Sequence, residues 1–565
     1  MTFSEMNYQR PDFDQTYSDM KEYLVKMEQA AAEPDFFKAF EDLDTLSNHF
    51  DTMATLCFVR YSINTGDDFY KSEQDTMDEQ LPRFQEIPSE AARICLESKF
   101  RPAFEEKYGK HLLEKFEVKR KIFTPEIVDD LVEENKLVSE YQKLTASAKI
   151  HFEGEERNLS GLTPFMESMD RGMRKRANDA SWNWFAENSG KLDQIYDALV
   201  KVRTRIGQKL GYDNFIPVAY ARMGRTDWTQ SDARIYRDQI AESVVPLTQK
   251  LYRQQAQRIG IDQMKNYDLN LKFLTGNPTP KGDEPFLLEA AAHMYEELSP
   301  HTHEFFTLMR SRELMDLTTK AGKANGGYMT FFPEFKVPFI FSNFNGTSGD
   351  VDVLTHEAGH AFQGWLVRDA RPRTLNDITS EVAEIHSMSM EFFTHPWMEK
   401  FFGEDTEKYF YAHVAHTLNF LPYGASIDEL QEWVYEHPDA APSERNAKYR
   451  EIEKKYLPHL DYDGHEFLEQ GGRWQKQLHV YLYPFYYLDY TLAQVCAHQY
   501  FNWSRKDPKA AWASYLELCS QSGRKPFTKL VPDAGLKNPF AAGTIASITP
   551  MLEEYLDHLD YSRIQ

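Results

Sequence analysis

The five residues His356-Glu357-Ala358-Gly359-His360 constrain the structure of this chain more than any other part of its sequence. On an α-helix, residues four apart lie on one face, about 6 Å apart along the axis. His356 and His360 can therefore bind one cation if this segment is helical. Glu357 lies one position round the helix, where its carboxylate is poorly aimed at the cation but can accept a proton from a nearby water. The motif predicts a zinc-binding helix with Glu357 as a general base.

The residues around the motif predict the helix that it needs. Residues 339–346 read as a strand that ends in an Asn-Gly turn, and residues 347–350 offer a capping box. Apolar residues then recur at helical spacing, namely Val351, Leu354, Ala358, Phe362 and Trp365. We therefore expect an amphipathic helix that begins near residue 348.

A catalytic zinc site usually takes three protein ligands, so one more is required. The next expected helix, over residues 376–398, carries three acidic candidates, Glu381, Glu384 and Glu391. Glu384 and Glu391 are seven residues apart and share a face, whereas Glu381 lies on a neighbouring strip. One of the two on the shared face could bind the metal while the other hydrogen-bonds a histidine ligand. Spacing alone leaves the choice open.

The strand before the metal-binding helix is a candidate for binding substrate. Pro338 at its start cannot donate to a sheet ladder, which suggests an edge position. An extended peptide could then pair with this strand and contact Phe339, Phe341 and Asn343. The alternative is an ordinary edge that a loop covers.

Several segments, taken in order, resemble the thimet oligopeptidase and oligoendopeptidase F family of zinc metallopeptidases. They are Gly326-Gly327-Tyr328, Asn345-Gly346-Thr347, the motif at 356–360, Glu384 to Glu391, and a tyrosine-rich stretch near residue 485. The resemblance is strongest over residues 320–500. It implies that Glu384, the first glutamate of an E-x-x-S-x-x-x-E pattern, is the third ligand of one zinc ion per chain, and that Glu391 supports the site. Some family members cleave proline-containing, collagen-derived peptides, a preference that this sequence does not reveal.

The tyrosine-rich stretch suggests a second catalytic element. Hydrolysis of a peptide bond builds negative charge on the carbonyl oxygen, and phenol or imidazole donors can stabilise that charge. The family resemblance implies this role for a histidine and tyrosines of this region, with His479 and Tyr490 as first choices. The two branches of the family align differently here and leave open Tyr483, Tyr486 and Tyr487. An aromatic face packed in the core is the alternative for Tyr486.

Composition limits the partners and the compartment. The chain has 64 basic and 88 acidic residues and a net charge of −24, which argues against nucleic acid and anionic membranes as partners. No apolar run reaches transmembrane length, and the first residues lack the pattern of a secretory signal, so we expect a cytoplasmic protein. Its 4 cysteines are too scattered for a disulfide framework and should be reduced. Short peptides are the expected partners of a monomer or small homo-oligomer.

Helical periodicity dominates the rest of the chain and predicts a mainly α fold with a small β-sheet next to the zinc helix. It is clear in residues 17–31, 127–145, 191–210, 232–257 and 286–297. The family resemblance implies two helical lobes around a deep central channel with zinc on its floor. Ser189-Gly190 suggests a division into an N-terminal helical lobe, residues 1–190, and a catalytic domain, residues 191–565.

These predictions together describe a zinc metalloendopeptidase that cleaves internal bonds of short oligopeptides. A zinc hydrolase of a non-peptide amide would keep the same ligands but would have less use for an edge strand and tyrosines. A non-catalytic peptide-binding helical protein would keep the channel without turnover.

Overall fold

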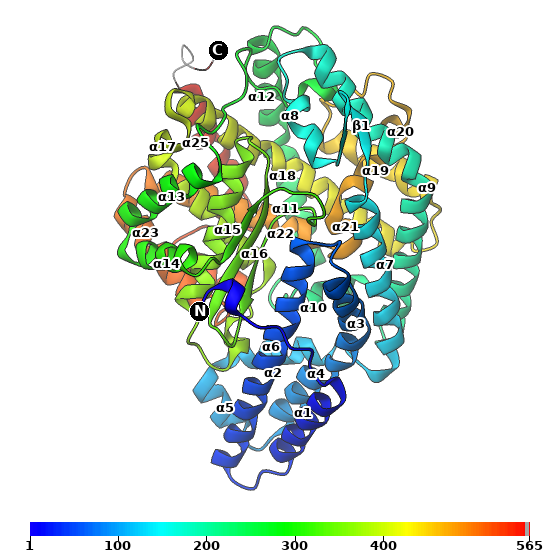
Figure 1. The fold of residues 1–565 in the computed structure, drawn as a ribbon, viewed down its shortest axis with the longest axis vertical. Helices are drawn as coiled ribbons and strands as arrows, with labels where there is room; N and C mark the ends of the chain where they lie inside the picture. The colour runs from blue at the N-terminus through cyan, green and yellow to red at the C-terminus, as the bar shows by residue number, and fades with distance from the viewer. Residues whose placement is uncertain (560–563, 565) are drawn as a thin grey trace.

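The computed structural model describes residues 1–559 and residue 564, and helices dominate it (Figure 1). The mainly helical fold predicted from the spacing of apolar residues is confirmed. None of the helices within these described residues combines the length and the hydropathy that a bilayer crossing demands. All four cysteines are buried and free, as expected.

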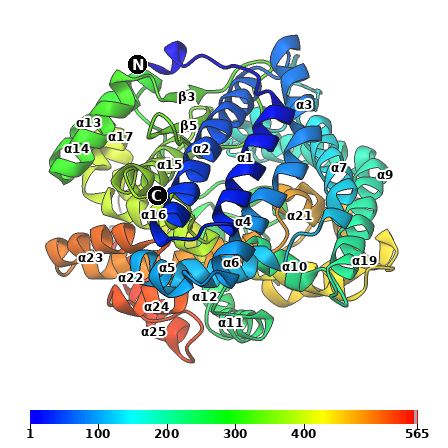
Figure 2. The ribbon, with the colours of Figure 1, turned by 90° about the horizontal axis from the view of Figure 1, so that it is seen from below.

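The first six helices form an extension at one end of the molecule (Figures 1 and 2). They are α1 (Phe13–Glu28), α2 (Glu33–Ile63), α3 (Asp68–Phe84), α4 (Glu86–Glu97), α5 (Arg101–Tyr108) and α6 (Lys110–Arg120). Asp12 caps α1 by accepting from the backbone N–H of Gln15, and Met20, Leu24 and Met27 form its buried stripe. Apolar residues between 20 and 116, joined by Leu375, make a hydrophobic core separate from that of the main body.

The main body begins with helices that pack mostly against helices close to them in the sequence. They are α7 (Val128–Ala146), α8 (Thr163–Met166), α9 (Arg171–Lys209), α10 (Ile216–Arg222), α11 (Gln230–Ser243), α12 (Val245–Arg258), α13 (Glu284–Leu298) and α14 (Pro300–Ser311), with a hairpin of β1 (Ile150–Phe152) and β2 (Glu155–Arg157). Residue 190 lies inside α9, so no loop marks the division expected there. The division into two domains remains a prediction.

A three-stranded sheet precedes the helix that carries the motif at 356–360 and has the order β3 (Met315–Thr318), β5 (Val337–Phe344), β4 (Tyr328–Phe332). The prediction that residues 339–344 form an edge strand is wrong, because β5 is central. Pro338 pairs only with β4, opposite Phe331, since β3 joins β5 from Ile340 onward. Pro338 thus marks one position of β5 that lacks a second neighbour, while the edge strands of the sheet are β3 and β4.

The second half of the chain is again helical. It contains α15 (Gly349–Leu366), α16 (Ser380–Phe393), α17 (Glu399–Phe402), α18 (Thr406–Glu436), α19 (Pro442–Tyr456), α20 (Glu466–Glu469), α21 (Leu478–Leu482), α22 (Tyr486–Ser504), α23 (Pro508–Gln521), α24 (Phe527–Asp533) and α25 (Thr544–Asp557). The start of α15 confirms the predicted helix, and the Asp350 carboxylate accepts from the backbone N–H groups of Asn345 and Gly346, which ties the turn to the helix. α22 packs along α16 and α18.

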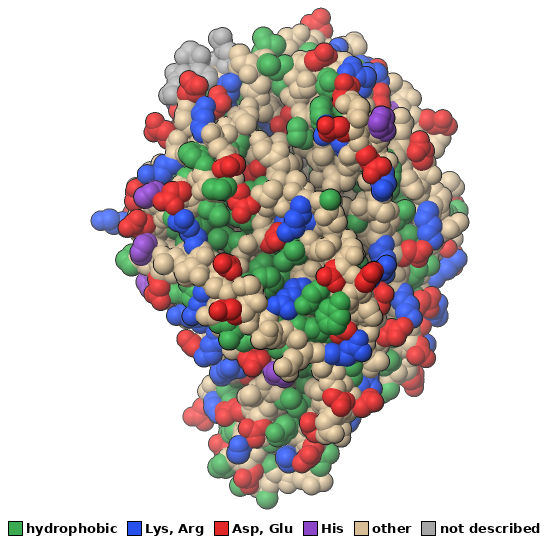
Figure 3. Space-filling view, in the orientation of Figure 1, with side chains coloured by type: hydrophobic (Ala, Val, Ile, Leu, Met, Phe, Trp, Pro, Cys, Tyr) green, Lys and Arg blue, Asp and Glu red, His purple; other side chains and the backbone are tan. Residues whose placement is uncertain are grey.

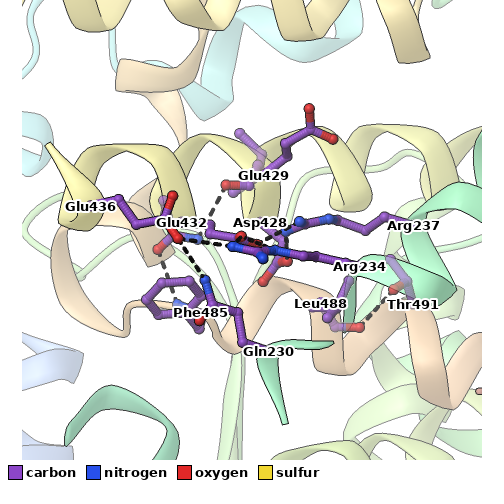
Figure 4. Close-up of polar contacts among 12 residues, drawn as sticks. Gln230, Arg234, Arg237, Asp428, Glu429, Glu432, Glu436, Phe485, Leu488 and Thr491 are labelled. Atoms are coloured by element: carbon purple, nitrogen blue, oxygen red, sulfur yellow. Dashed lines mark hydrogen bonds and ion pairs between the residues drawn. The ribbon is translucent and has the colours of Figure 1, made fainter. Parts of the chain in front are cut away.

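Charged side chains inside the body join α11 to α18. Arg237 donates to Asp428 and to Glu432, and all three side chains are buried. Arg234, also on α11 but more exposed, forms ion pairs with Glu432 and Glu436 of α18 (Figure 4). A buried charge is tolerated only when it is paired and hydrogen-bonded, so these pairs fix how the two helices meet. On the outer face, acidic and basic side chains are interspersed (Figure 3).

Candidate metal centre

His356, His360 and Glu384 converge on one point between α15 and α16. Their ligand atoms all lie within 4.8 Å of one another. Glu384 Oε2 is 3.2 Å from Nε2 of His356 and 3.2 Å from Nε2 of His360. Two imidazole nitrogens and one carboxylate oxygen are a donor set of catalytic zinc sites, so these residues fit the metal that the sequence predicts.

Gly359 explains how the two helices come close enough. A Cβ atom at this position would lie 2.6 Å from the carbonyl oxygen of His386 and 2.6 Å from Cα of Ser387. Any side chain here would clash with the backbone of α16. The glycine inside the motif therefore sets the helix crossing that brings Glu384 to the two histidines.

The three glutamates of α16 have different surroundings. Glu384 faces the histidines, and Ser387 donates to its Oε2 at 2.9 Å. Glu391 accepts a hydrogen bond of 2.6 Å from Nδ1 of His356. Glu381 points elsewhere and accepts from the indole N–H of Trp228 at 3.0 Å. The geometry thus favours Glu384 as ligand and Glu391 as the support of a ligand.

The neighbouring histidines keep the carboxyl groups of Glu384 and Glu391 ionised. Burial opposes ionisation of Glu384, but His360 and His356 hold the pKa of this carboxyl well below its usual range. Glu391 is also buried, yet its hydrogen bonds with His356 and His413 lower its pKa to about 2. Both carboxylates are therefore charged at neutral pH, as a ligand and its support must be.

Glu357 is placed differently from these two carboxylates. Its side chain is buried, and its Oε2 has no hydrogen-bond partner within the part of the chain that the structure describes. Burial raises its pKa, although the neighbouring His356 and His360 act in the opposite direction. Gly327 lies against its other oxygen, where a Cβ atom would be 3.6 Å from Oε1. An unpartnered carboxylate oxygen beside the metal-binding residues suits a proton acceptor.

The hydrogen bonds behind His356 extend further than the sequence suggested. Nε2 of His413, on α18, donates to Glu391 Oε2 at 2.8 Å, and Nδ1 of His413 is hydrogen-bonded to Nε2 of His395 at 2.9 Å. Both histidines are buried. The sequence gives no sign of this contact, because no spacing rule relates α18 to α16 or to the short turn at His395 that follows α16.

His479 and Tyr490 lie together near the metal-binding residues, with 3.3 Å between Nε2 and the phenol oxygen. Burial lowers the pKa of His479 to about 4, so the ring is neutral at pH 7. Gln477 donates to Nδ1 at 2.8 Å, which leaves the ring proton on Nε2. Burial and the nearby Glu384 and Glu357 raise the pKa of Tyr490, which keeps its hydroxyl protonated. Both groups are therefore hydrogen-bond donors.

The other three tyrosines differ in their contacts. Tyr486 donates to Glu384 Oε1 at 2.8 Å and so contacts the metal-binding set directly. The Tyr487 ring packs edge-on against Phe420 and Tyr423. Tyr483 is 51% exposed. The structure thus brings Tyr486 and Tyr490 to the candidate ligands.

The three residues predicted to bind substrate through β5 do not lie on an edge. The Phe339 and Phe341 side chains have no exposed surface. The Asn343 amide donates to the carbonyl oxygens of Ala324 and Gly326, at 2.8 Å each, and so holds the segment that leads into β4. Because β5 is paired on both sides, its backbone cannot accept a further strand there.

Comparison with known proteins places this geometry in a family. The model described as Peptidase family M3 matches residues 164–549, and the model described as Peptidase M3 N-terminal domain matches residues 3–123.

Solved structures and a curated relative agree with those matches. A structure of PZ peptidase A with an inhibitor is 50% identical, with a TM-score of 0.97 and 99% of each chain covered. An X-ray structure described as oligoendopeptidase F is also 50% identical, with a TM-score of 0.98 over 99% of each chain. Group B oligopeptidase PepB from Streptococcus agalactiae serotype III is 23% identical over 64% of this chain. The match spans only 61% of the length of PepB.

Proposed function

Because this chain belongs to peptidase family M3, we propose that it is a zinc-dependent endopeptidase that hydrolyses internal bonds of short peptides. The observation that carries the proposal is the convergence of His356, His360 and Glu384 beside the unpartnered carboxylate of Glu357. One zinc ion per chain would be held by these two imidazoles and the Glu384 carboxylate. When bound, zinc polarises a carbonyl and makes water acidic enough to lose a proton near neutral pH.

Glu357 is the general base of the proposed reaction. Its carboxylate accepts a proton from the water that attacks the scissile carbonyl, and then delivers that proton to the leaving amine. The support for this role is its position, one residue from His356 on α15, together with a free oxygen that makes no competing hydrogen bond within the described residues. Its raised pKa makes it a better proton acceptor than an exposed glutamate.

His479 and Tyr490 stabilise the negative charge that develops on the carbonyl oxygen. Both are donors already held at 3.3 Å from each other, so they need little rearrangement when substrate arrives. Tyr486 has a different role, because its hydroxyl already binds Glu384. It orients that carboxylate towards the metal.

The peptide pairs with β4. This strand is the edge strand on the side of β5 nearest the general base, since Gly327 immediately before it lies against Glu357. An extended peptide added beside residues 328–332 gains main-chain hydrogen bonds independent of its sequence. That mode suits an enzyme that accepts varied short peptides. The names of PZ peptidase A and of oligoendopeptidase F point to the same substrate class.

Metal analysis combined with peptide mapping tests the proposal. The purified protein is expected to hold one zinc per chain and to cut internal bonds in a mixed pool of short peptides, as read by mass spectrometry. Removal of zinc with a chelator should stop cleavage, and one equivalent of zinc should restore it. A zinc-loaded protein that cleaves small amides but no peptide would be an amidase instead. One that binds peptides without any turnover would be a binding protein.

A further inference from the structure

Phe485 adopts a left-handed backbone conformation, with φ of 69° and ψ of 2°. Residues with bulky side chains rarely do so, and such strained positions gather at functional sites. The other described non-glycine residues with positive φ are Glu153, Glu313, Lys336 and Asp463. None of those four is buried, whereas Phe485 has no exposed surface. Phe485 is therefore the one whose strain lies inside the protein.

Phe485 lies between the helix that carries His479 and the helix that carries Tyr490. It is the residue immediately before α22, and α21 ends three residues earlier, at Leu482. His479 lies on α21, whereas Tyr486 and Tyr490 lie on α22. The dihedral angles of Phe485 thus determine where His479 sits relative to Tyr490, and that pair is hydrogen-bonded at 3.3 Å.

Both peptide groups of Phe485 are held by buried side chains, one from α18 and one from the loop between α10 and α11. Its N–H donates to Oε1 of Gln431, on α18, at 3.0 Å. Its carbonyl oxygen accepts from Nη2 of Arg225 at 2.8 Å. Gln431 has no exposed surface, and Arg225 is also buried. In Figure 4, Phe485 lies beside the part of α18 that carries Asp428 and Glu432, whose ion pairs with Arg237 anchor that helix.

Arg225 is itself held rigidly. Its guanidinium pairs with Asp489 of α22 at 2.6 Å and lies over the rings of Tyr220 and Trp228, at 4.3 and 4.1 Å from their centroids. The Trp228 indole in turn donates to Glu381 of α16 at 3.0 Å. The contacts that hold Phe485 are therefore continuous with the helix that carries Glu384.

We propose that Gln431 and Arg225 are positioning residues that hold Phe485 in its left-handed conformation and thereby set His479 against Tyr490. The inference rests on the proposed function, because it assumes that this pair stabilises the substrate carbonyl oxygen. Without a hydrogen bond on each side, Phe485 relaxes towards an ordinary backbone region. α22 is held by its packing on α16 and α18, and α21 by the donation of Arg203 to the Tyr481 carbonyl oxygen and by the stacking of Tyr481 on Tyr141. The expected change is therefore a small shift of His479 relative to Tyr490 and not a displacement of either helix.

Gln431 is the better residue to change, because removal of Arg225 would leave the buried Asp489 without its partner. Gln431→Met should lower kcat by about 10-fold or more, with KM and zinc content little changed, since a small misplacement of a catalytic group has effects of this size. Gln431→Asn keeps a buried amide but withdraws it from Phe485, and it should behave in the same way. Gln494→Met is the matched control, because Gln494 is a buried glutamine of α22 outside these contacts. It should retain wild-type kcat.

A double-mutant cycle with His479→Ala separates positioning from general damage to the fold. If Gln431 acts through His479, Gln431→Met should cost less than about 2-fold in kcat once His479 is absent. An equal loss with and without His479, or a kcat in Gln431→Met equal to that of wild type, would overturn the inference while the proposed function stands. A zinc-loaded wild-type protein that cleaves no peptide would overturn both.

Discussion

The two sides of the candidate site are built by different means. On the ligand side, His356, His360 and Glu384 come from two regular helices whose separation is fixed at Gly359. On the donor side, His479 and Tyr490 come from two helices joined through a strained residue. Helical spacing determines the first arrangement, whereas contacts between distant parts of the chain determine the second.

The two sides also differ in how their polar groups are satisfied. On the ligand side, hydrogen bonds run from His356 through Glu391 and His413 to His395, all within the protein. On the donor side, His479 and Tyr490 contact each other through one hydrogen bond of 3.3 Å. The candidate ligands are thus held by a continuous chain of buried hydrogen bonds, whereas the two candidate donors are held chiefly by each other and by Gln477.

Glu357 should show the largest effect, because it lies on the same helix as His356 and His360 but is not one of the candidate ligands. Glu357→Gln removes the proton acceptor and should lower kcat by at least about 10³-fold, within the range attributed to general bases. Zinc content should stay at one per chain. Activity that persists in the zinc-loaded variant would remove Glu357 from the mechanism.

Glu384→Gln should have the next largest effect, on metal binding. Loss of a charged ligand should weaken zinc binding by more than about 100-fold, which exceeds the usual effect of changing a supporting residue. Glu381→Gln is the matched control on the same helix, and it should keep wild-type zinc affinity in competition with a chelator. An unchanged affinity in Glu384→Gln would move the ligand to another acid.

The donor side is tested by removing single hydroxyl groups. Tyr490→Phe should lower kcat by about 10²-fold with zinc retained, as expected for one donor to a developing oxyanion. Tyr487→Phe should change kcat little, because it keeps the ring that packs against His479 and Tyr490 and removes only a hydroxyl that has no contact with the candidate ligands among the described hydrogen bonds. Equal losses in the two variants would mean that the donor side has been assigned to the wrong tyrosine.

The extended support on the ligand side predicts a smaller effect. His413→Leu removes the donor to Glu391 and should weaken zinc binding by about 10-fold, at the lower end for residues behind a ligand. His498→Leu is its control. His498 is equally buried and packs against the same Phe392 ring, but it binds Thr417 instead of Glu391. A similar loss of zinc in both variants would show that only core packing matters.

The smallest effect concerns stability and pH. Burial lowers the pKa of His498 to about 3, whereas an unfolded histidine titrates near about 6.5. Between these values the unfolded state binds a proton that the folded state does not, so the free energy of unfolding falls as pH falls. His498→Leu should flatten this dependence by about 1.4 kcal/mol per pH unit. Denaturant unfolding at pH 4, 5 and 6, where the unfolded histidine is mostly protonated, measures the slope, and a slope equal to that of wild type contradicts the prediction.

The ligand side could be predicted because its information is local. The motif at 356–360 and the spacing of Glu384 and Glu391 both follow from helical geometry, and α15 begins next to residue 348 as expected. The expected capping box does not form, because Asp350 accepts from the backbone N–H groups of Asn345 and Gly346. The long helix expected over residues 232–257 is instead two helices, because Pro246 lies in the first turn of α12 and ends the continuous ladder.

The remaining features depend on pairings that one sequence does not encode locally. Pro338 was read as an edge signal for all of β5, but the strand gains its second neighbour two residues later. His413 comes from α18, and Arg225 comes from the loop between α10 and α11, far away in the chain from Phe485. The left-handed Phe485 had no signal either, since glycine or asparagine usually marks that conformation.

The close approach at Gly359 has a consequence for engineering. At Gly359 the backbone of α15 lies directly against the backbone of α16, so no side-chain volume sets the distance between the two helices at that point. Core positions further along α15 and α16 can therefore be repacked for heat resistance with little change in ligand spacing. Position 359 itself has to stay as it is, since even a methyl group there would push the two helices apart.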